Sequence, residues 1–199
     1  MKYLLENLNN ISEDNTHLFH HAKKEKIEKA QTLTARKQSI LGEQLLIKGL
    51  QIFYHLSYSK LNFTIHNSGK PYILGNPIYY NISHSHDYCI CAFSETEIGV
   101  DIEKIRVIDK KTISFFATTK EEQYIFQSNI DINKRAFEIF TLKEAYFKML
   151  GTGITDLKNV EFQIDDMNIN CSDSKAKLWF SDQLDDYVIA FCEKKVERV

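Results

Sequence analysis

The sequence predicts an α+β protein built from two similar halves. Two long stretches, 35–56 and 132–150, carry apolar residues at three- and four-residue spacing, which is typical of helices that face a core. Short β-like segments bounded by polar turns follow each of these helices. Because the order of helix and strands occurs twice, we expect two halves, 1–96 and 97–199, although no repeat is visible at the level of residues.

The composition limits the class of protein. With 199 residues, of which 43% are hydrophobic and 12% aromatic, the chain can form a substantial core and is not disordered. A net charge of −2 gives no global attraction to nucleic acid or to an anionic membrane, and the lysine-rich stretch 23–29 lacks interleaved aromatic residues. We therefore expect no nucleic-acid partner and no membrane contact.

The four cysteines and the N-terminus indicate the compartment. No C-x-x-C spacing is present, so a zinc site is not expected, and the cysteines are interpreted as small buried hydrophobes in a reducing environment. The first ten residues lack the apolar run of a signal peptide, and no stretch approaches the ~20 apolar residues of a membrane helix. The expected location is the cytoplasm.

In the first half, a weakly alternating segment at 2–8 predicts an edge strand. The basic segment that follows has helical spacing and includes Lys26 and Lys29; it is either a solvated helix face or a patch for a phosphate-bearing ligand. Arg36 lies at the start of the next helix, where free backbone N–H groups also favour anions.

Segments with strand-like patterns begin after this helix. A short strand at 62–65 and turn residues at 67–71 precede the segment 88–93, which is apolar on both faces and is predicted to be a central strand. Ser83-His84-Ser85 is expected to form a polar turn just before that strand. Its hydroxyls, imidazole and backbone N–H groups could form a phosphate cradle, or the turn could hold no ligand.

The stretch Gly99-Val100-Asp101-Ile102-Glu103 predicts a strand with two carboxylates on one face, since side chains alternate along a strand. Like charges held side by side among apolar neighbours repel, and a hard divalent cation such as magnesium or manganese would neutralise them. The alternative is an ordinary acidic pair on an exposed strand.

The second long helix carries further charged candidates. Glu144 and Lys148 are four residues apart and share a helix face, so Glu144 could add a third carboxylate and Lys148 a mobile positive charge. The alternative is a surface pair that contributes about 0.3–0.5 kcal/mol. Gly151 is predicted to cap this helix. Phe115 and Phe116 are expected to anchor the core before it, and three strands are expected after it, at 160–164, 177–180 and 187–192.

Four motifs in order make a more specific pattern than any one of them. They are Gly69-Lys70-Pro71, then Asn81-Ile82-Ser83-His84-Ser85, then Gly99 to Glu103, then Phe140-Thr141-Leu142-Lys143-Glu144-Ala145 with Lys148 and Gly151-x-Gly153. In this order and spacing the sequence resembles the 4'-phosphopantetheinyl transferases of the long, surfactin-synthetase-activating type. The resemblance runs from about Lys23 to Gly153.

This resemblance implies a fold and a reaction. The fold is a pseudo-twofold monomer of two similar halves, each a small antiparallel sheet packed with a long helix, with coenzyme A and magnesium in the cleft between them. The reaction moves the phosphopantetheine arm of coenzyme A to a serine hydroxyl of an apo acyl or peptidyl carrier protein and releases adenosine 3',5'-bisphosphate. The acceptor pathway, whether fatty acid, polyketide or nonribosomal peptide, is not specified by the motifs.

The resemblance also implies residue roles. The N-terminal half would supply contacts to the phosphates and nucleotide, and the C-terminal half the metal site and the catalytic helix. A glutamate of the family near position 120 corresponds to Glu121 or Glu122. The remaining assignments are the metal ligands Asp101, Glu103 and Glu144; the phosphate and nucleotide contacts Lys70, Ser83 and His84; the pyrophosphate contact Lys148; the base Glu144 or a metal-bound water; and, for the 3'-phosphate, Lys26 and Lys29, with Arg36 in place of an arginine that Gln38 replaces.

Two rival functions remain at this point. A magnesium-dependent phosphohydrolase could use the same carboxylates on a nucleotide or on coenzyme A, and it would need no protein acceptor. A non-catalytic module that binds coenzyme A or a carrier protein would be expected to have lost a metal ligand, whereas all three carboxylates are present.

Overall fold

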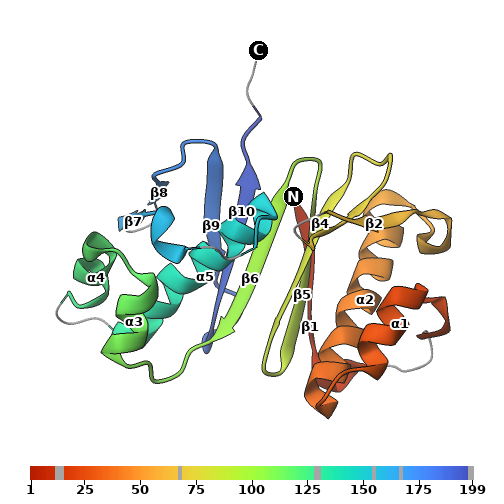
Figure 1. Ribbon diagram of the computed structural model, residues 1–199, viewed down its shortest axis with the longest axis horizontal. Coiled ribbons are helices and arrows are strands. Elements are labelled where there is room, and N and C mark those ends of the chain that lie inside the picture. The colour runs from red at the N-terminus through yellow and green to blue at the C-terminus, as the bar shows by residue number, and fades with distance from the viewer. Residues whose placement is uncertain (12–15, 67–68, 128–130, 154–155, 166–167, 197–199) are drawn as a thin grey trace.

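The computed structural model describes residues 1–11, 16–66, 69–127, 131–153, 156–165 and 168–196. Two three-stranded antiparallel sheets stand next to each other in the middle of the molecule, and a long helix covers the outer side of each (Figure 1). The predicted α+β architecture of two halves, each with a small antiparallel sheet and a long helix, is confirmed.

The first half packs its sheet on α2 (Leu33–Tyr54), whose N-terminus is capped by Thr32. The strand order is β1-β5-β4, so β1 is an edge strand and β5 is central, as the sequence predicts. Buried leucines of α2 form one core cluster with the apolar residues of β5. The elements of this half are β1 (Lys2–Asn7), α1 (His21–Glu28), α2, β2 (Phe63–Ile65), β3 (Pro71–Ile73), β4 (Tyr79–Ser85) and β5 (Tyr88–Ser94), with short 3-10 helices at Leu8–Asn10, Thr16–Leu18 and Tyr58–Lys60.

The second half repeats this arrangement with α5 (Ile132–Leu150) and the strand order β6-β10-β9. Gly151 ends α5 with φ 70°, in agreement with the predicted glycine cap. The other elements are β6 (Ile98–Lys104), α3 (Lys110–Phe116), α4 (Thr119–Ile125), β7 (Phe162–Asp165), β8 (Asn168–Cys171), β9 (Ala176–Ser181) and β10 (Tyr187–Lys194), with a 3-10 helix at Leu157–Asn159.

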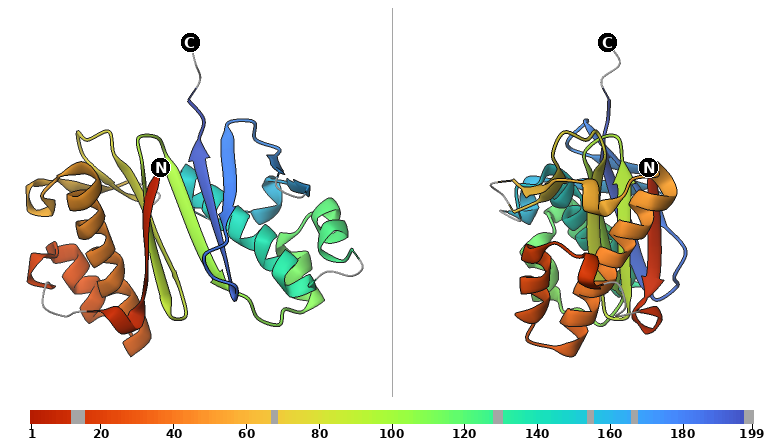
Figure 2. Two further views of the ribbon diagram at one scale, coloured as in Figure 1. Left: turned by 180° about the vertical axis from the view of Figure 1, so that it is seen from behind. Right: turned by 90° about the vertical axis from the view of Figure 1, so that its right-hand side faces the viewer.

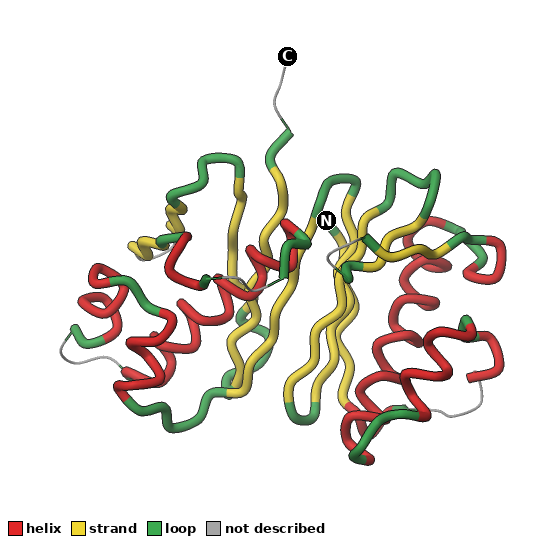
Figure 3. The backbone as a smooth tube through the Cα atoms, in the orientation of Figure 1, coloured by secondary structure: helices red, strands yellow, loops and turns green. Residues whose placement is uncertain are grey.

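The inner faces of the two sheets share a core. Ile90 and Ala92 of β5 lie in one cluster with Val100 of β6 and Phe191 of β10, all four fully buried. Seen from behind, the strands lie between the two helical layers, and the tube in Figure 3 shows the same order of helix, sheet, sheet and helix (Figures 2 and 3). β4 and β6 meet at the seam between the halves, which places the predicted motifs next to one another.

Three predictions about local structure are wrong. Ser83-His84-Ser85 is not a turn, because it forms the last part of β4; the turn consists of His86 and Asp87, and His86 adopts φ 48°. Phe116 is buried as predicted, whereas Phe115 is 79% exposed, because neighbouring residues of a helix point about 100° apart and only one of the two faces the core. The strand β8 was not anticipated, since its sequence has little apolar character.

Within the described residues, none of the helices has an apolar stretch long enough to cross a lipid bilayer.

Candidate functional site

The two carboxylates of β6 face the hydroxyls of β4. Ser83 Oγ donates to Asp101 Oδ1 at 2.7 Å, and Ser85 Oγ donates to Glu103 Oε2 at 3.1 Å. Both pairs have two-residue spacing, so the two strands present matching faces across the seam. Asn81 Oδ1 also accepts from the Val100 backbone N–H at 2.9 Å. Side-chain hydrogen bonds from β4 thus hold β6 in place at the seam, where the two strands belong to separate sheets.

Lys148 of α5 reaches into this group from the second helix. Its Nζ lies 2.5 Å from Asp101 Oδ1 and 3.0 Å from Ser83 Oγ. Its side chain is 30% exposed and that of Asp101 only 4%, so the ion pair is largely buried. The interpretation of Lys148 as half of a helix-surface pair is wrong, because its ion-pair partner is Asp101 on strand β6.

Glu144 lies one turn before Lys148, and the charges of the other two carboxylates affect its pKa. Burial, followed by the negative charge of Asp101, raises the pKa of Glu144 to about 7. The pKa of Glu103 is also raised, first by burial and then by Asp101, while hydrogen bonds from Ser85 and Arg106 act in the opposite direction. The charge of Asp101 therefore disfavours the ionised forms of both Glu144 and Glu103.

One oxygen of this group has no partner. Asp101 Oδ2 is buried and accepts no hydrogen bond in the structure. Among the described residues, no group of three or more His, Cys, Asp or Glu side chains has the arrangement of a metal site. Asp101, Glu103 and Glu144 are the carboxylates that could hold a hard cation here, together with oxygens from a substrate and from water.

The spacing between β6 and α5 depends on Gly99. A Cβ added at Gly99 would lie 1.9 Å from the backbone oxygen of Ala145 and 2.4 Å from the backbone nitrogen of Met149. No larger residue fits between this strand and this helix, so Gly99 sets how closely Asp101 approaches Glu144.

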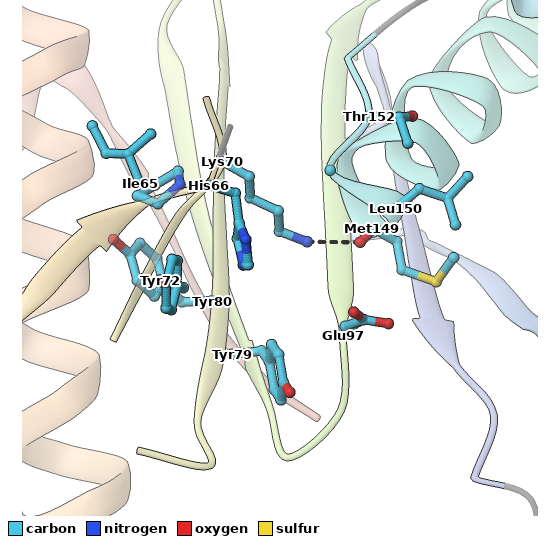
Figure 4. A pocket seen from close by; sticks show the side chains of 12 residues that line it. Ile65, His66, Lys70, Tyr72, Tyr79, Tyr80, Glu97, Met149, Leu150 and Thr152 are labelled. Carbon is cyan, nitrogen blue, oxygen red and sulfur yellow. Dashed lines mark hydrogen bonds between the residues drawn. The ribbon is translucent and has the colours of Figure 1, made fainter. Parts of the chain in front are cut away.

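Lys70 lies at the same seam but does not point freely into solvent. Its Nζ donates to the backbone oxygens of Ile98 at 3.0 Å and Met149 at 2.8 Å, which joins the first half to both β6 and α5. Lys70 lines a cavity of about 450 Å³ together with the stacked rings of His66 and Tyr72, and Figure 4 shows its ammonium pointing away from these rings toward Met149. Burial lowers the pKa of Lys70 to about 8, against the opposing charge of Glu97.

A smaller cavity of about 300 Å³ shares Lys70 with the first one. Its lining includes Glu144, Lys148 and Phe147, together with the glycines Gly151 and Gly153 after α5. Lys70 therefore lines both the cavity beside the acidic site and the larger cavity at the seam.

The predicted phosphate contacts His84, Lys26 and Lys29 come together elsewhere. Since side chains alternate along β4, His84 points to the opposite face from Ser83 and, with both lysines and Ser39, lines a cavity of about 530 Å³. His84 keeps an exposed edge, and the surrounding protein together with the charges of Lys148 and Lys26 lowers its pKa. The two ammonium groups, with the imidazole as a hydrogen-bonding group beside them, suit an anionic ligand.

Arg36 and Gln38 have different positions on α2. Arg36 is exposed in the first turn, and the lining of the cavity around His84 includes its neighbour Ala35. Gln38 is buried, and its Nε2 donates to the backbone oxygen of His86 at 3.0 Å. Gln38 thus fixes the β4–β5 turn rather than contributing a positive charge.

Glu121 belongs to the core and not to the acidic site. Both it and Lys143 are fully buried, and their charged groups lie 2.8 Å apart. Lys143 Nζ also donates to the backbone oxygens of Leu157 and Val160, and Glu121 accepts from the backbone N–H of Phe162. This pair fixes the side of α5 that faces away from the cleft. Sequence reasoning did not predict it, although the neighbouring Lys143 and Glu144 must point to different sides of a helix.

Comparison with known proteins finds similar sequences. A sequence model of the 4'-phosphopantetheinyl transferase superfamily matches residues 97–192, which include β6 and α5. The 4'-phosphopantetheinyl transferase gsp of Aneurinibacillus migulanus is 35% identical over 120 residues, covering 59% of this chain and 49% of that protein. The 4'-phosphopantetheinyl transferase Sfp of Bacillus subtilis is 30% identical over 120 residues, covering 59% and 54%.

The chain spans about half the length of these curated relatives. The crystal structure of Thermotoga maritima holo-[acyl-carrier-protein] synthase is similar with a TM-score of 0.43 and 22% identity, covering 50% of this chain and 64% of that one. The sequence comparisons confirm the resemblance to the 4'-phosphopantetheinyl transferases.

Proposed function

We propose that this relative of the 4'-phosphopantetheinyl transferases transfers the 4'-phosphopantetheine arm of coenzyme A to a serine hydroxyl of an apo acyl or peptidyl carrier protein. The second product is adenosine 3',5'-bisphosphate, and the activity is of the holo-[acyl-carrier-protein] synthase kind. The observation that carries the proposal is the ion pair of Lys148 with Asp101 beside the hydroxyl of Ser83, in a site where burial and the charges of Asp101 and Glu103 raise the pKa of the nearby Glu144.

Asp101, Glu103 and Glu144 would hold Mg²⁺ or Mn²⁺. The unpartnered Oδ2 of Asp101 supports this, and so do the raised pKa values of Glu103 and Glu144, because burial and the charge of Asp101 disfavour ionised forms that a bound cation would stabilise. Such a cation supplies positive charge that offsets the carboxylates and the pyrophosphate of coenzyme A.

The residues of the chain would divide the remaining work. Ser83 and Lys148 bind and orient the pyrophosphate, and the ammonium of Lys148 stabilises the charge that develops on the departing phosphate oxygen. His84, Lys26 and Lys29 hold the 3'-phosphate in their own cavity on the other face of β4. Transfer then depends mainly on positioning and charge neutralisation.

Glu144 is the proposed base for the carrier serine. Its pKa is raised to about 7 in the metal-free protein, and its carboxylate form, which a bound cation would favour, can accept the proton as the serine oxygen attacks the phosphorus. The proton passes to Glu144 Oε, and the bond from phosphorus to the leaving phosphate oxygen breaks.

The direct test is incubation with coenzyme A, MgCl₂ and a panel of apo carrier proteins, followed by intact mass. The expected result is addition of one phosphopantetheine per carrier, which Asp101→Asn abolishes and Lys48→Ala, an exposed change on α2, leaves intact. Consumption of coenzyme A without a carrier would favour the phosphohydrolase. Binding of coenzyme A without transfer to any carrier would favour the non-catalytic module.

A further inference from the structure

The short helix α1 places both lysines of the cavity around His84, because Lys26 lies within it and Lys29 is its C-cap residue; Glu25 of α1 lines the same cavity. Few side chains of α1 hold it in place. Among its side chains that the structure describes, only Ile27 is buried, where it packs against Phe19 and Ile40. Its N-cap residue, His20, makes no capping hydrogen bond. Because isolated helices of this length are unstable in water, contacts with the rest of the protein must position α1.

The strongest polar contact of α1 is with a buried glutamate of α2. Lys23 Nζ lies 3.2 Å from Glu43 Oε2, and the side chains are only 19% and 8% exposed. The hydroxyl of Tyr58 donates to the other carboxylate oxygen of Glu43. Glu43 is thus a buried acid, held by one lysine and one tyrosine, that no step of the proposed reaction uses.

The contact bears directly on the cavity. Lys23, Lys26 and Ile27 lie within two turns of α1, and the positive charges of Lys26 and Lys23 both contribute to lowering the pKa of His84. The ring of His20 packs on Tyr58, with centroids 4.7 Å apart, and so continues the same attachment before the helix begins. The attachment through Glu43 is therefore on the same helix as the lysines that line the cavity.

We infer that Glu43, through Lys23, is a positioning residue that holds α1 so that Lys26 and Lys29 face a phosphate group bound beside His84. The inference rests on the proposed function, because it takes that phosphate to be the 3'-phosphate of coenzyme A. Glu43 itself touches no ligand.

The sign of the effect separates positioning from simple electrostatics. Loss of a negative charge near an anion site strengthens anion binding if long-range charge alone decides. Loss of an attachment weakens it, because the two lysines must then be ordered when the ligand binds. Glu43→Gln should therefore weaken binding, although it makes the site more positive.

The experiment compares coenzyme A with dephospho-coenzyme A, which lacks the 3'-phosphate, by calorimetry on the full chain. Glu43→Gln and Lys23→Met should each reduce affinity for coenzyme A roughly tenfold, the loss expected for one weakened charge-assisted contact, and leave affinity for dephospho-coenzyme A within about twofold. Lys23→Arg should restore most of the affinity. Tyr58→Phe, which removes the other hydrogen bond of Glu43, is the matched control and should keep the preference for coenzyme A.

Hydrogen exchange of ligand-free protein gives an independent readout. The amides of α1 should exchange faster in Glu43→Gln than in the parent, while those of α5 should not change. Equal exchange in α1, tighter binding of coenzyme A by Glu43→Gln, or equal losses for both ligands would each overturn the inference. A parent protein that does not distinguish the two ligands would also overturn it, whereas transfer to a carrier, measured by mass, tests the proposed function separately.

Discussion

Replacing Gly99 by alanine tests whether the close approach of β6 to α5 builds the acidic site. The added Cβ would lie 1.9 Å from the backbone oxygen of Ala145, where ordinary contact begins near 3.4 Å, so strand and helix must separate by about 1.5 Å. Neither neighbour is a side chain that could rotate away. Overpacking of this kind typically costs about 1–3 kcal/mol, and we expect a value at the upper end.

The consequence for the proposed reaction should be larger than the consequence for folding. Ala145 is adjacent to Glu144, so the shift moves Glu144 and Lys148 away from Asp101. Since a misplacement of ~1 Å can reduce a rate by about 10²-fold, kcat for transfer to a carrier protein should fall by that order. The assay is steady-state transfer read by intact mass, corrected for the folded fraction from urea unfolding.

Gly42→Ala is the matched control, because its Cβ would meet side-chain atoms and no backbone, the nearest being Cγ2 of Ile82 at 2.9 Å. It should cost less stability and leave kcat near the parent value. If Gly99→Ala folded and transferred at the parent rate, the distance between β6 and α5 would not determine activity, and the assignment of the site to this seam would have to be abandoned.

Four further outcomes are expected. Lys148→Met should lower kcat by roughly 10²–10³-fold, the usual loss for one preorganised charge, with little change in calorimetric Mg²⁺ affinity; unchanged kcat would contradict its assignment. Glu144→Gln should lower kcat strongly yet stabilise the metal-free protein above pH 7, because a raised folded pKa, here about 7 against 4.5, makes wild-type stability fall as pH rises through that window. Lys70 has a folded pKa lowered to about 8 from 10.5, so the unfolding free energy of wild type relative to Lys70→Met should rise from pH 8 to pH 10.5, and a flat difference in urea titrations would refute this. Lys143→Met should reduce the free energy of unfolding by about 3–5 kcal/mol, since it leaves the carboxylate of Glu121 buried without its partner, and the added change Glu121→Gln should recover part of the loss.

Local periodicity was sufficient for the main elements. The stripe at 132–150 coincides with α5, and the stripe at 35–56 agrees with α2 to within two residues at each end. Asp101 and Glu103 share a face because alternation along a strand is a local property. These features follow from backbone geometry, which a short window of sequence contains.

Ser83-His84-Ser85 shows where local reasoning failed. Three consecutive polar residues indicate a turn when no partner strand is known. In the structure Ser83 and Ser85 donate to Asp101 and Glu103, so the polar residues are satisfied within a strand at the seam. The partner strand is 18 residues away in sequence, and only the packing of the two halves brings it into contact.

The long lysine side chains depended entirely on tertiary structure. Lys70 donates to a backbone oxygen 79 residues away, and Lys148 pairs with a carboxylate 47 residues away. Lys143 and Glu144 are adjacent in the chain, yet one is sealed in the core by Glu121 and the other faces the acidic cleft. The sequence by itself determined that Lys143 and Glu144 lie on one helix and point about 100° apart. Which side met the core and which met the cleft was decided by the packing of α5 against β6, because a flexible charged side chain takes the partner that the assembled fold places within its reach.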